Sequence, residues 1–424
     1  MLDVKLVRDT PDVIRHDLRR RGWVEKLPLV DEAIALDREW RLLKKEVDDM
    51  RHRQNEVTAE IATLKRSGAD VEDKVSEVKG IPQRIRELDA RADEAQKKLR
   101  EILMGLPNIL VDSVPVGPDD SGNVTVRTFG APRSPGFQLR DHIDVLTSLG
   151  LVDMERAAKI SGARFFFLKG DALLLEQSIM RYALDLLVQR GFTPVGPPLM
   201  MKREAYQGVV DLNDFGPVIY KVEGEDLYLI ATSEHPLVSM HMDEILDGRS
   251  LPLKYCGFSP NFRVEAGAHG KDTKGIFRTH QFYKVEQVVF SRPEESWAIH
   301  EQLIENAEAI FQSLGLHYRV VNVCTGDMGT VAAKKYDLEA WMPAQGKFRE
   351  MVSCSNVTDY QARRLMIRYR EKPGADPRLV HILNSTAVTT RALVAVVENF
   401  QQADGSIEIP KPLIPYMGGK ERIG

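Results

Sequence analysis

The sequence predicts an α+β protein, in which an antiparallel two-helix coiled-coil arm precedes a larger domain built on an antiparallel sheet. Between residues 29 and 104, apolar residues recur at alternating steps of three and four, the heptad pattern of packed helices. After residue 136, short alternating segments are separated by turn residues and amphipathic helices, as in an α+β domain. The predicted organisation is a helical region over 1–108, a linker over 109–136 and a main domain over 137–424.

Composition limits the classes of protein that the chain can represent. Its 424 residues are 43% apolar and 28% charged, which suits two or three ordinary domains. The net charge of −4 means that any nucleic-acid surface must be a local basic patch. Cys256, Cys324 and Cys354 form no Cys-x-x-Cys pair, which argues against a disulfide framework or a Cys-rich zinc site. No signal-like apolar core or membrane-length run is present, so we expect a cytoplasmic location.

The N-terminal region predicts a small cap followed by two long helices. In residues 1–24, Thr10 is a candidate N-cap before Pro11, and Gly22 ends the helix. The first long helix ends near Ser67, and a second heptad seam begins at Val71. The first seam consists of Ala33, Leu36, Trp40, Leu43, Val47, Met50, Gln54, Val57, Ile61 and Leu64.

The second helix is expected to fold back on the first, with a kink where Gly80 and Pro82 interrupt its seam. At ~1.5 Å per residue each helix would be about 50 Å long, so the hairpin must project from the main domain. Such a rod could be a dimerisation coiled coil or a spacer. It could also be a probe that contacts the phosphates of a large partner, through Arg51, Arg53, Lys65 and Arg66.

A long hairpin from Phe258 to Val289 is the most informative part of the main domain. Two strand-like segments flank a Gly- and Lys-rich loop over Ala266–Gly275. In the second strand, alternation places Phe277 and Thr279 on one face. The opposite face carries Arg278, His280, Phe282, Lys284 and Glu286. This face could hold a nucleotide phosphate, an adenine ring and an ammonium group, or it could be an ordinary solvated strand face.

Three other segments carry polar residues that could join such a site. Thr232-Ser233-Glu234 precedes a helix, where it is either a capping box or a ligand loop. Glu350, in the strand-like segment 347–356, is either a hard oxygen ligand for a divalent cation or a surface carboxylate. Asn384 and Thr386 lead through Arg391 into a helix. The chain lacks the Gly-x-x-x-x-Gly-Lys-Ser/Thr and Gly-x-Gly-x-x-Gly motifs, so bound ATP would have to be held by side chains on a sheet.

These motifs carry a resemblance to a known family. Phe262-Arg263-Val264-Glu265, a loop, and then Arg278-x-x-Gln281-Phe282-x-x-x-Glu286 resembles motif 2 of class II aminoacyl-tRNA synthetases. The sequences of Phe262–Gly267 and Gly270–Gly275 are similar to those of seryl-tRNA synthetases in particular. The helix Leu173–Arg190 with the strand up to Pro198 resembles motif 1, and Arg391 at a helix start resembles motif 3. The helical arm and the Leu106-Pro107-Asn108 junction extend the likeness to the whole chain.

The resemblance implies an activity, partners and cofactors. It implies a class II catalytic domain over 137–424 that activates L-serine with ATP to seryl-adenylate and loads the 3′ end of tRNA(Ser), which the N-terminal arm binds. It also implies Mg²⁺, a homodimer formed through motif 1 and the common type of the family, which uses no zinc. Whether tRNA(Sec) is charged as well stays open.

Roles for individual residues follow only from this resemblance. Arg263, Glu350 and Arg391 are the implied catalytic residues, and Glu350 and Ser353 the implied metal ligands. The implied ATP-binding residues are Arg263, Val264, Glu265, Arg278, Thr279, Phe282, Glu350, Met351, Val352, Ser353 and Arg391. The implied serine-binding residues are Thr232, Ser233, Glu234, Arg263, Glu286, Asn384 and Thr386.

The chain departs from the family pattern at one point, and two rival functions stay open. The pattern has one more residue between Asn384 and Arg391, and one residue lost inside a helix would turn the arginine by about 100°. The first rival is an amino-acid activator that loads a carrier protein, but such relatives lack the long arm. The second is an inactive paralogue, which the shortened motif 3 favours and the presence of Arg263, Glu286 and Glu350 disfavours.

Overall fold

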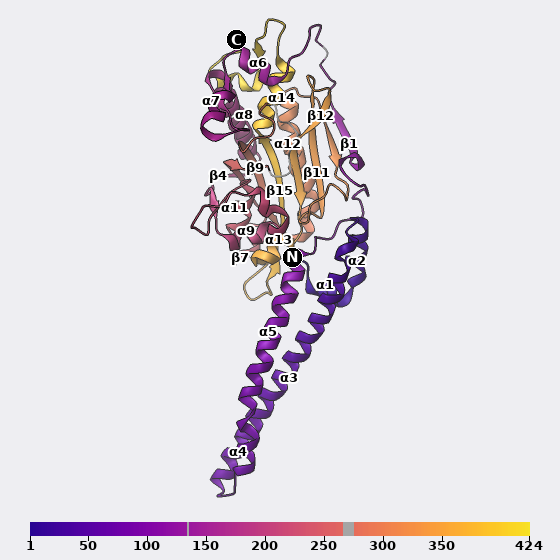
Figure 1. The fold of residues 1–424 in the computed structure, drawn as a ribbon, viewed down its shortest axis with the longest axis vertical. Coiled ribbons are helices and arrows are strands. Elements are labelled where there is room, and N and C mark those ends of the chain that lie inside the picture. The colour runs from indigo at the N-terminus through magenta and orange to yellow at the C-terminus, as the bar shows by residue number, and fades with distance from the viewer. Residues whose placement is uncertain (134, 266–274) are drawn as a thin grey trace. The chain divides into compact units, whose positions relative to one another are not determined.

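The computed structural model describes residues 1–133, 135–265 and 275–424 (Figure 1). Within it the chain forms two compact units, Met1–Ile109 and Leu110–Gly424. The loop predicted over Ala266–Gly275 lies, apart from Gly275, outside the described residues.

The N-terminal unit is a helical hairpin with a small cap. Ion pairs such as Glu46 with Arg84 and Glu60 with Lys74 join the two arms, so the arms run antiparallel, as predicted. Their interior buries Leu43, Val47, Leu88 and Ala92, in agreement with the heptad seams. At Gly80 the structure has a break between two helices, where the sequence predicted a kink. The helices are α1 (Val4–Asp9), α2 (Pro11–Arg20), α3 (Leu27–Arg66), α4 (Glu72–Lys79) and α5 (Ile81–Gly105).

A buried charge on α3 was not foreseen from the sequence. Asp37 on α3 is 1% exposed, at a place where the seam was assigned to the neighbouring Leu36. Arg8 of α1 donates hydrogen bonds to both carboxylate oxygens of Asp37, at 2.6 and 2.9 Å, and Arg41 donates a third at 2.9 Å. The Arg8 hydrogen bond holds the pKa of Asp37 below its ordinary value. This cluster ties the cap to the base of the hairpin.

The C-terminal unit is built on an eight-stranded sheet in the order β1-β10-β11-β12-β15-β9-β8-β4. All its neighbouring strands are antiparallel except β4 and β8, which agrees with the predicted antiparallel domain. The segment expected to be a linker contains β1, which pairs with β10 at the sheet edge. The strands are β1 (Val124–Phe129), β4 (Thr193–Val195), β8 (Leu253–Phe262), β9 (Gln281–Ser291), β10 (Tyr318–Asn322), β11 (Lys334–Met342), β12 (Lys347–Asn356) and β15 (His381–Thr389).

Helices α8 (Gly170–Gln189), α12 (Ser296–Ser313) and α14 (Thr390–Phe400) pack against the sheet and form the main core with it (Figure 1). Strand β9 shows how the sheet separates this core from the site. Val285 and Val289 lie in the core, while Phe282, Lys284 and Glu286 face a cavity. This alternation is the period of two that the sequence predicted for these positions.

The remaining elements surround the sheet. Within the described residues, no helix is both long enough and apolar enough to cross a membrane. The other helices are α6 (His142–Ser148), α7 (Met154–Ser161), α9 (Arg203–Val209), α10 (Leu212–Phe215), α11 (Glu234–Ser239) and α13 (Tyr360–Leu365). The short strands are β2 (Val152–Asp153), β3 (Phe167–Leu168), β5 (Met200–Met201), β6 (Tyr228–Leu229), β7 (Ile245–Asp247), β13 (Arg368–Arg370), β14 (Arg378–Leu379), β16 (Ile407–Glu408) and β17 (Arg422–Ile423).

Candidate active site

A cavity of about 490 Å³ lies over the middle of the large sheet. Its walls come from the β8–β9 hairpin, β12, β15, the start of α14 and the loop before α11. Most of the residues singled out in the sequence lie around this one cavity. They are Thr232, Glu234, Arg263, Glu265, Arg278, Thr279, Phe282, Glu286, Glu350, Met351, Ser353, Asn384, Thr386 and Arg391.

Three of the residues that the resemblance implied to bind ATP or serine do not line the cavity. Val352 is buried in the core between the sheet and the helices. Ser233 is also buried, and its hydroxyl donates a hydrogen bond to the carbonyl of Gly257 at 3.2 Å. Val264 donates its backbone N–H to the carbonyl of Val218 at 2.9 Å. In the structure these residues support the cavity wall from behind or beside it.

Cations and an aromatic ring define one end of the cavity. The guanidinium carbon of Arg263 lies 5.1 Å from the centre of the Phe282 ring. Arg278 donates a hydrogen bond to Glu265 at 2.9 Å, and the two form an ion pair. Arg391 donates to the Glu350 carbonyl at 2.9 Å and lies 3.5 Å from its carboxylate. Fixed guanidinium groups around an open volume can bind a polyphosphate, and the partly exposed Phe282 ring can stack on a base.

The return segment of the hairpin corrects one sequence-based prediction. The second strand was predicted to include residues 277–280, but β9 begins at Gln281. Strand alternation therefore does not apply to that segment, and Phe277, Arg278 and Thr279 all line the cavity. His280 lies outside the cavity lining, with its ring 5.1 Å from that of Phe165.

A β-bulge in β12 explains how Glu350 reaches the cavity. The register shifts between Leu338 and Glu339 of β11, because Val352 pairs with the first and Glu350 with the second. Met351 is the extra residue, and such a bulge redirects the side chains beside it. Both Glu350 and Met351 therefore line the cavity, while Val352 stays in the core.

A second bulge bears on the shortened interval before Arg391. In β15 the register shifts between Thr386 and Val388, so most of the interval is strand. Helix α14 begins only at Thr390, with the Thr389 hydroxyl capping it by accepting from the Arg391 N–H at 3.2 Å. The missing residue is therefore not lost from within a helix, and Arg391 lines the cavity from the first turn of α14.

Two carboxylates, the buried Glu286 and the partly buried Glu234, form the other end of the cavity. Glu286 is 1% exposed, forms an ion pair with Lys284, and accepts a hydrogen bond from the Thr386 hydroxyl at 3.5 Å. Burial raises the pKa of Glu286 to about 7, and the negative charge of Glu234 adds to this while Lys284 opposes it. Lys284 also donates to the Thr232 hydroxyl at 3.1 Å. This end offers oxygen acceptors suited to a small ammonium or hydroxyl compound.

At Glu350, in contrast to Glu286, the surroundings lower the pKa of the carboxyl group. Desolvation opposes ionisation of its carboxyl, but the positive charges of Arg391, Lys335 and Arg263 outweigh it and hold the pKa of Glu350 below its ordinary value. Glu350 is therefore ionised at neutral pH, with its side chain about half exposed. An ionised carboxylate beside a hydroxyl, here Ser353, is a donor set that a hard divalent cation accepts.

Sequence reasoning missed three residues of the carboxylate end. Lys284 was placed on the correct strand face but given no role. Gln361 on α13 donates to the Glu234 carboxylate at 3.2 Å, and its distance of 127 positions along the chain left no local signal. His235 lines the cavity. Its pKa is lowered to about 3, mainly by burial and also by the positive charges of Arg263 and Lys284, so the ring is neutral.

Comparison with known proteins places this geometry in a family. Residues 1–110 match the seryl-tRNA synthetase N-terminal domain, and residues 220–400 match the tRNA synthetase class II core domain (G, H, P, S and T). A serine–tRNA ligase from Methanocella arvoryzae is 53% identical, with both chains covered completely.

Solved structures agree with the match along the whole chain. A seryl-tRNA synthetase from Pyrococcus horikoshii, complexed with ATP, is 50% identical with a TM-score of 0.96, covering 100% of this chain and 99% of its own. A cytoplasmic serine–tRNA ligase from Naegleria fowleri, in complex with AMP, is 36% identical with a TM-score of 0.91, covering 100% of this chain and 98% of its own. The chain therefore belongs to the seryl-tRNA synthetase family of class II aminoacyl-tRNA synthetases.

Proposed function

We propose that this enzyme activates L-serine with ATP and transfers the seryl group to the 3′ end of tRNA(Ser). The observation that carries the proposal is the single cavity shared by Arg263, Phe282, Glu286 and Glu350. It combines a cationic, aromatic end suited to ATP with a carboxylate end suited to an amino acid. The two relatives solved with ATP and AMP support the nucleotide assignment.

In the first step, a serine carboxylate oxygen attacks the α-phosphorus of ATP and pyrophosphate leaves. Negative charge develops on the α-phosphate, so a preorganised cation there stabilises the transition state. We assign this role to Arg263, whose Nε donates to the Ala231 carbonyl at 3.3 Å and which lies against the Phe282 ring. Phe282 stacks on adenine, and Arg278 and Arg391 bind the distal phosphates. In the second step, the terminal adenosine hydroxyl of tRNA attacks the carbonyl carbon of seryl-adenylate, the bond between that carbon and the phosphate oxygen breaks, and AMP leaves.

Mg²⁺ fits the donor set on β12. The ionised Glu350 carboxylate and the Ser353 hydroxyl both line the cavity and offer the hard oxygen ligands that Mg²⁺ prefers. When bound, the ion would neutralise phosphate charge. Arg391, paired with Glu350 at 3.5 Å, keeps that carboxylate oriented toward the phosphate end.

We assign serine recognition to the buried end of the cavity, without zinc. Glu286 binds the serine ammonium, and the partly buried Glu234 and buried Thr386 hydrogen-bond its hydroxyl, which alanine cannot offer them. Among the described residues, a group of three His, Cys, Asp or Glu side chains with their ligand atoms close together is formed by Asp141, His142 and Glu398, and none of these three lines the cavity.

The helical hairpin is the part of the chain to which we assign tRNA binding. Lys65 and Arg66 are exposed in the last turn of α3. Arg51 and Arg53 pair with carboxylates of the opposite arm, at 2.8 Å from Asp89 and 2.5 Å from Glu77. Exposed ion pairs of this kind contribute little stability, so tRNA phosphates can take over these arginines at small cost.

We also propose a homodimer formed around α8, the helix that resembles motif 1. Leu173, Leu174 and Val188 on this helix are each at least 40% exposed, which is unusual for leucine and valine on one helix. Covering these side chains with a second copy would remove their apolar surface from water.

Serine-dependent exchange of pyrophosphate into ATP tests activation, and charging of total tRNA with labelled serine tests transfer. We expect a chain of residues 110–424 to keep exchange and to lose most tRNA charging. Exchange without charging by the full chain would favour the carrier-loading rival, and no exchange would favour the inactive paralogue. Equal charging by the full and shortened chains would refute the role of the hairpin.

A further inference from the structure

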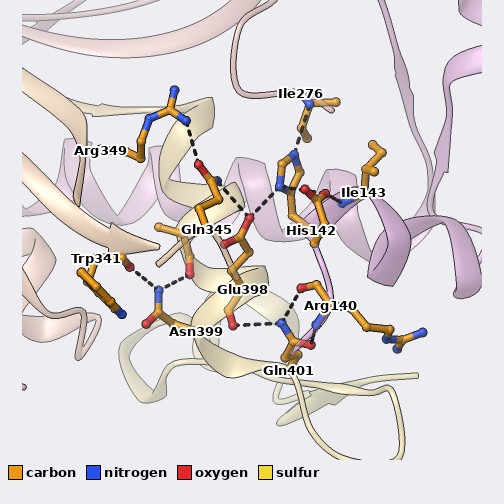
Figure 2. A network of polar contacts seen from close by, with 12 residues as sticks. Arg140, His142, Ile143, Ile276, Trp341, Gln345, Arg349, Glu398, Asn399 and Gln401 are labelled. Carbon is orange, nitrogen blue, oxygen red and sulfur yellow. Dashed lines mark hydrogen bonds and ion pairs between the residues drawn. The ribbon is translucent and has the colours of Figure 1, made fainter. Parts of the chain in front are cut away.

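A buried polar network lies beside the cavity, at the end of the hairpin loop (Figure 2). His142 at the start of α6 and Glu398 near the end of α14 are 2% and 0% exposed at their side chains. The Nδ1 atom of His142 lies 2.8 Å from a carboxylate oxygen of Glu398. The Nε2 atom of the same ring lies 3.3 Å from the backbone N–H of Ile276, which donates to it. Figure 2 shows His142 placed between these two partners.

The hydrogen bonds fix the state of the imidazole. Because a backbone N–H is always a donor, Nε2 of His142 must be the acceptor in its bond with Ile276. The ring proton is therefore on Nδ1 and is donated to Glu398. The neighbouring Asp141 carboxylate lies 3.3 Å from Nδ1 and accepts from the Ile143 N–H at 2.8 Å, as an N-cap. Both ring nitrogens are already used, so the cluster is better described as a hydrogen-bond network than as a metal site.

Gly275 shows how closely the loop end approaches this ring. A Cβ atom at Gly275 would lie 2.5 Å from Nε2 of His142, and the residue has a φ of +93°. A side chain here would both strain the backbone and push the ring away. Glycine at this position is therefore required for the contact between His142 and Ile276.

A second branch of the network returns to the same loop segment. Gln345, in the turn between β11 and β12, donates to the Glu398 carboxylate at 3.2 Å. Arg349 donates to the Gln345 side-chain carbonyl at 2.7 Å. The Arg349 guanidinium carbon then lies 3.8 Å from the centre of the Phe277 ring. The circuit thus begins at the backbone of Ile276 and ends at the side chain of Phe277, its neighbour in sequence.

Phe277 connects this circuit to the cavity. Its carbonyl accepts a hydrogen bond from Arg391 at 3.4 Å, and the Arg391 guanidinium carbon lies 4.7 Å from its ring. The next residue, Arg278, is the second cation of the phosphate end. Two arginines that we assign to the distal phosphates of ATP therefore depend on where the backbone of residues 276–278 lies.

We propose that His142, oriented by Glu398, is a positioning residue for ATP binding, because it fixes the segment Ile276–Arg278 and through it Arg278 and Arg391. This inference rests on the proposed function, since it assumes that these two arginines bind ATP. His142 does not line the cavity, so it acts through the loop backbone and not through contact with a substrate.

Two substitutions of His142 separate its hydrogen bond with Ile276 from its hydrogen bond with Glu398. In His142→Gln, the side-chain carbonyl can reach the place of Nε2 and accept from Ile276. In His142→Asn, the shorter amide can still donate to Glu398 but leaves the Ile276 N–H without its acceptor. We expect the KM for ATP in pyrophosphate exchange to rise about fivefold in His142→Asn, as for the loss of one neutral hydrogen bond, and less than about twofold in His142→Gln. The KM for serine should stay within about twofold of the original value in both variants.

Two further variants provide a control and a safeguard. His317→Asn makes the same substitution at a largely buried histidine whose Nδ1 lies 2.6 Å from the Phe129 carbonyl, away from the cavity, and should leave the KM for ATP unchanged. Gln345→Ala removes the hydrogen bonds of Gln345 with Glu398 and Arg349. Because Gln345 lies in a partly exposed turn, this variant should fold even where a His142 variant does not. It should raise the KM for ATP by about two- to fivefold without lowering the melting temperature.

Calorimetric titration with ATP in the absence of serine separates this inference from the proposed function. If the original protein shows no serine-dependent exchange, the proposed function fails, while weaker ATP binding by His142→Asn than by His142→Gln would still support the positioning role. Equal ATP affinity in the original protein and both His142 variants would overturn it. If His142→Asn changed kcat and the KM values for ATP and serine by similar factors, the positioning role would also be overturned. The same holds if the original protein carried stoichiometric bound metal that His142→Gln had lost, because the cluster would then be a metal site.

Discussion

The buried carboxyl of Glu286 leads to a sharp prediction about pH. Burial and the nearby Glu234 raise its pKa from an ordinary 4.5 to about 7, against the opposing charge of Lys284. If Glu286 binds the serine ammonium, only its ionised form is competent. Catalytic efficiency for serine should therefore be lost as the pH falls through 7, in a range where an ordinary glutamate would stay ionised.

The expected magnitude follows from the fraction of ionised Glu286 in the free enzyme. With a pKa of about 7, that fraction is roughly 3% at pH 5.5 and roughly 75% at pH 7.5, a difference of about 25-fold. With the ordinary value of 4.5, the fraction would exceed about 90% at both pH values. The kcat/KM for serine, measured by pyrophosphate exchange at saturating ATP, distinguishes the two cases because it reports on the free enzyme.

Two substitutions provide the controls. Glu286→Gln should lower the efficiency and remove the step near pH 7. Lys284→Met should move the midpoint upward, because it removes the positive charge that opposes the shift. A profile for the original protein that varies less than about twofold between pH 5.5 and 7.5 would refute the assignment of Glu286.

Three other changes test separate parts of the structure. Arg263→Ala should slow pyrophosphate exchange by at least about 100-fold, or ~3 kcal/mol, with little change in melting temperature; a loss below tenfold would remove its transition-state role. Asp37→Asn should destabilise the cap of the hairpin by about 1–2 kcal/mol at pH 7. This value is kept small because the partners Arg8 and Arg41 are partly exposed, so solvent screens the ion pairs. Hydrogen exchange of residues 1–41 measures the change. Because the pKa of Asp37 is lowered in the folded state, this contribution should be complete above pH ~5 and fade below its ordinary value of 3.8; a pH-independent difference would count against the ion pair. Leu88→Ala removes a fully buried side chain of the seam, so it should destabilise the hairpin by about 2–5 kcal/mol. The variant should charge tRNA less well but keep serine-dependent pyrophosphate exchange. Loss of exchange as well would show that the two units do not fold independently.

The sequence by itself determined the features that local periodicity encodes. The heptad seams predicted the antiparallel hairpin, because a repeat of seven brings apolar residues to one helix face whatever the rest of the chain does. Alternation placed Phe282, Lys284 and Glu286 on one face of β9 for the same reason. The resemblance to the class II motifs also pointed to most of the residues that surround one cavity.

Only the tertiary structure decided which polar groups meet, because those contacts join residues far apart in the chain. The bulge at Met351 brings Glu350 to the cavity, and a bulge depends on strand pairing that one segment cannot reveal. The raised pKa of Glu286 and the circuit through His142 likewise arise from burial against distant neighbours. Local pattern fixes the direction in which a side chain points, whereas dielectric environment and hydrogen-bond partners exist only once the sheet and its helices have packed.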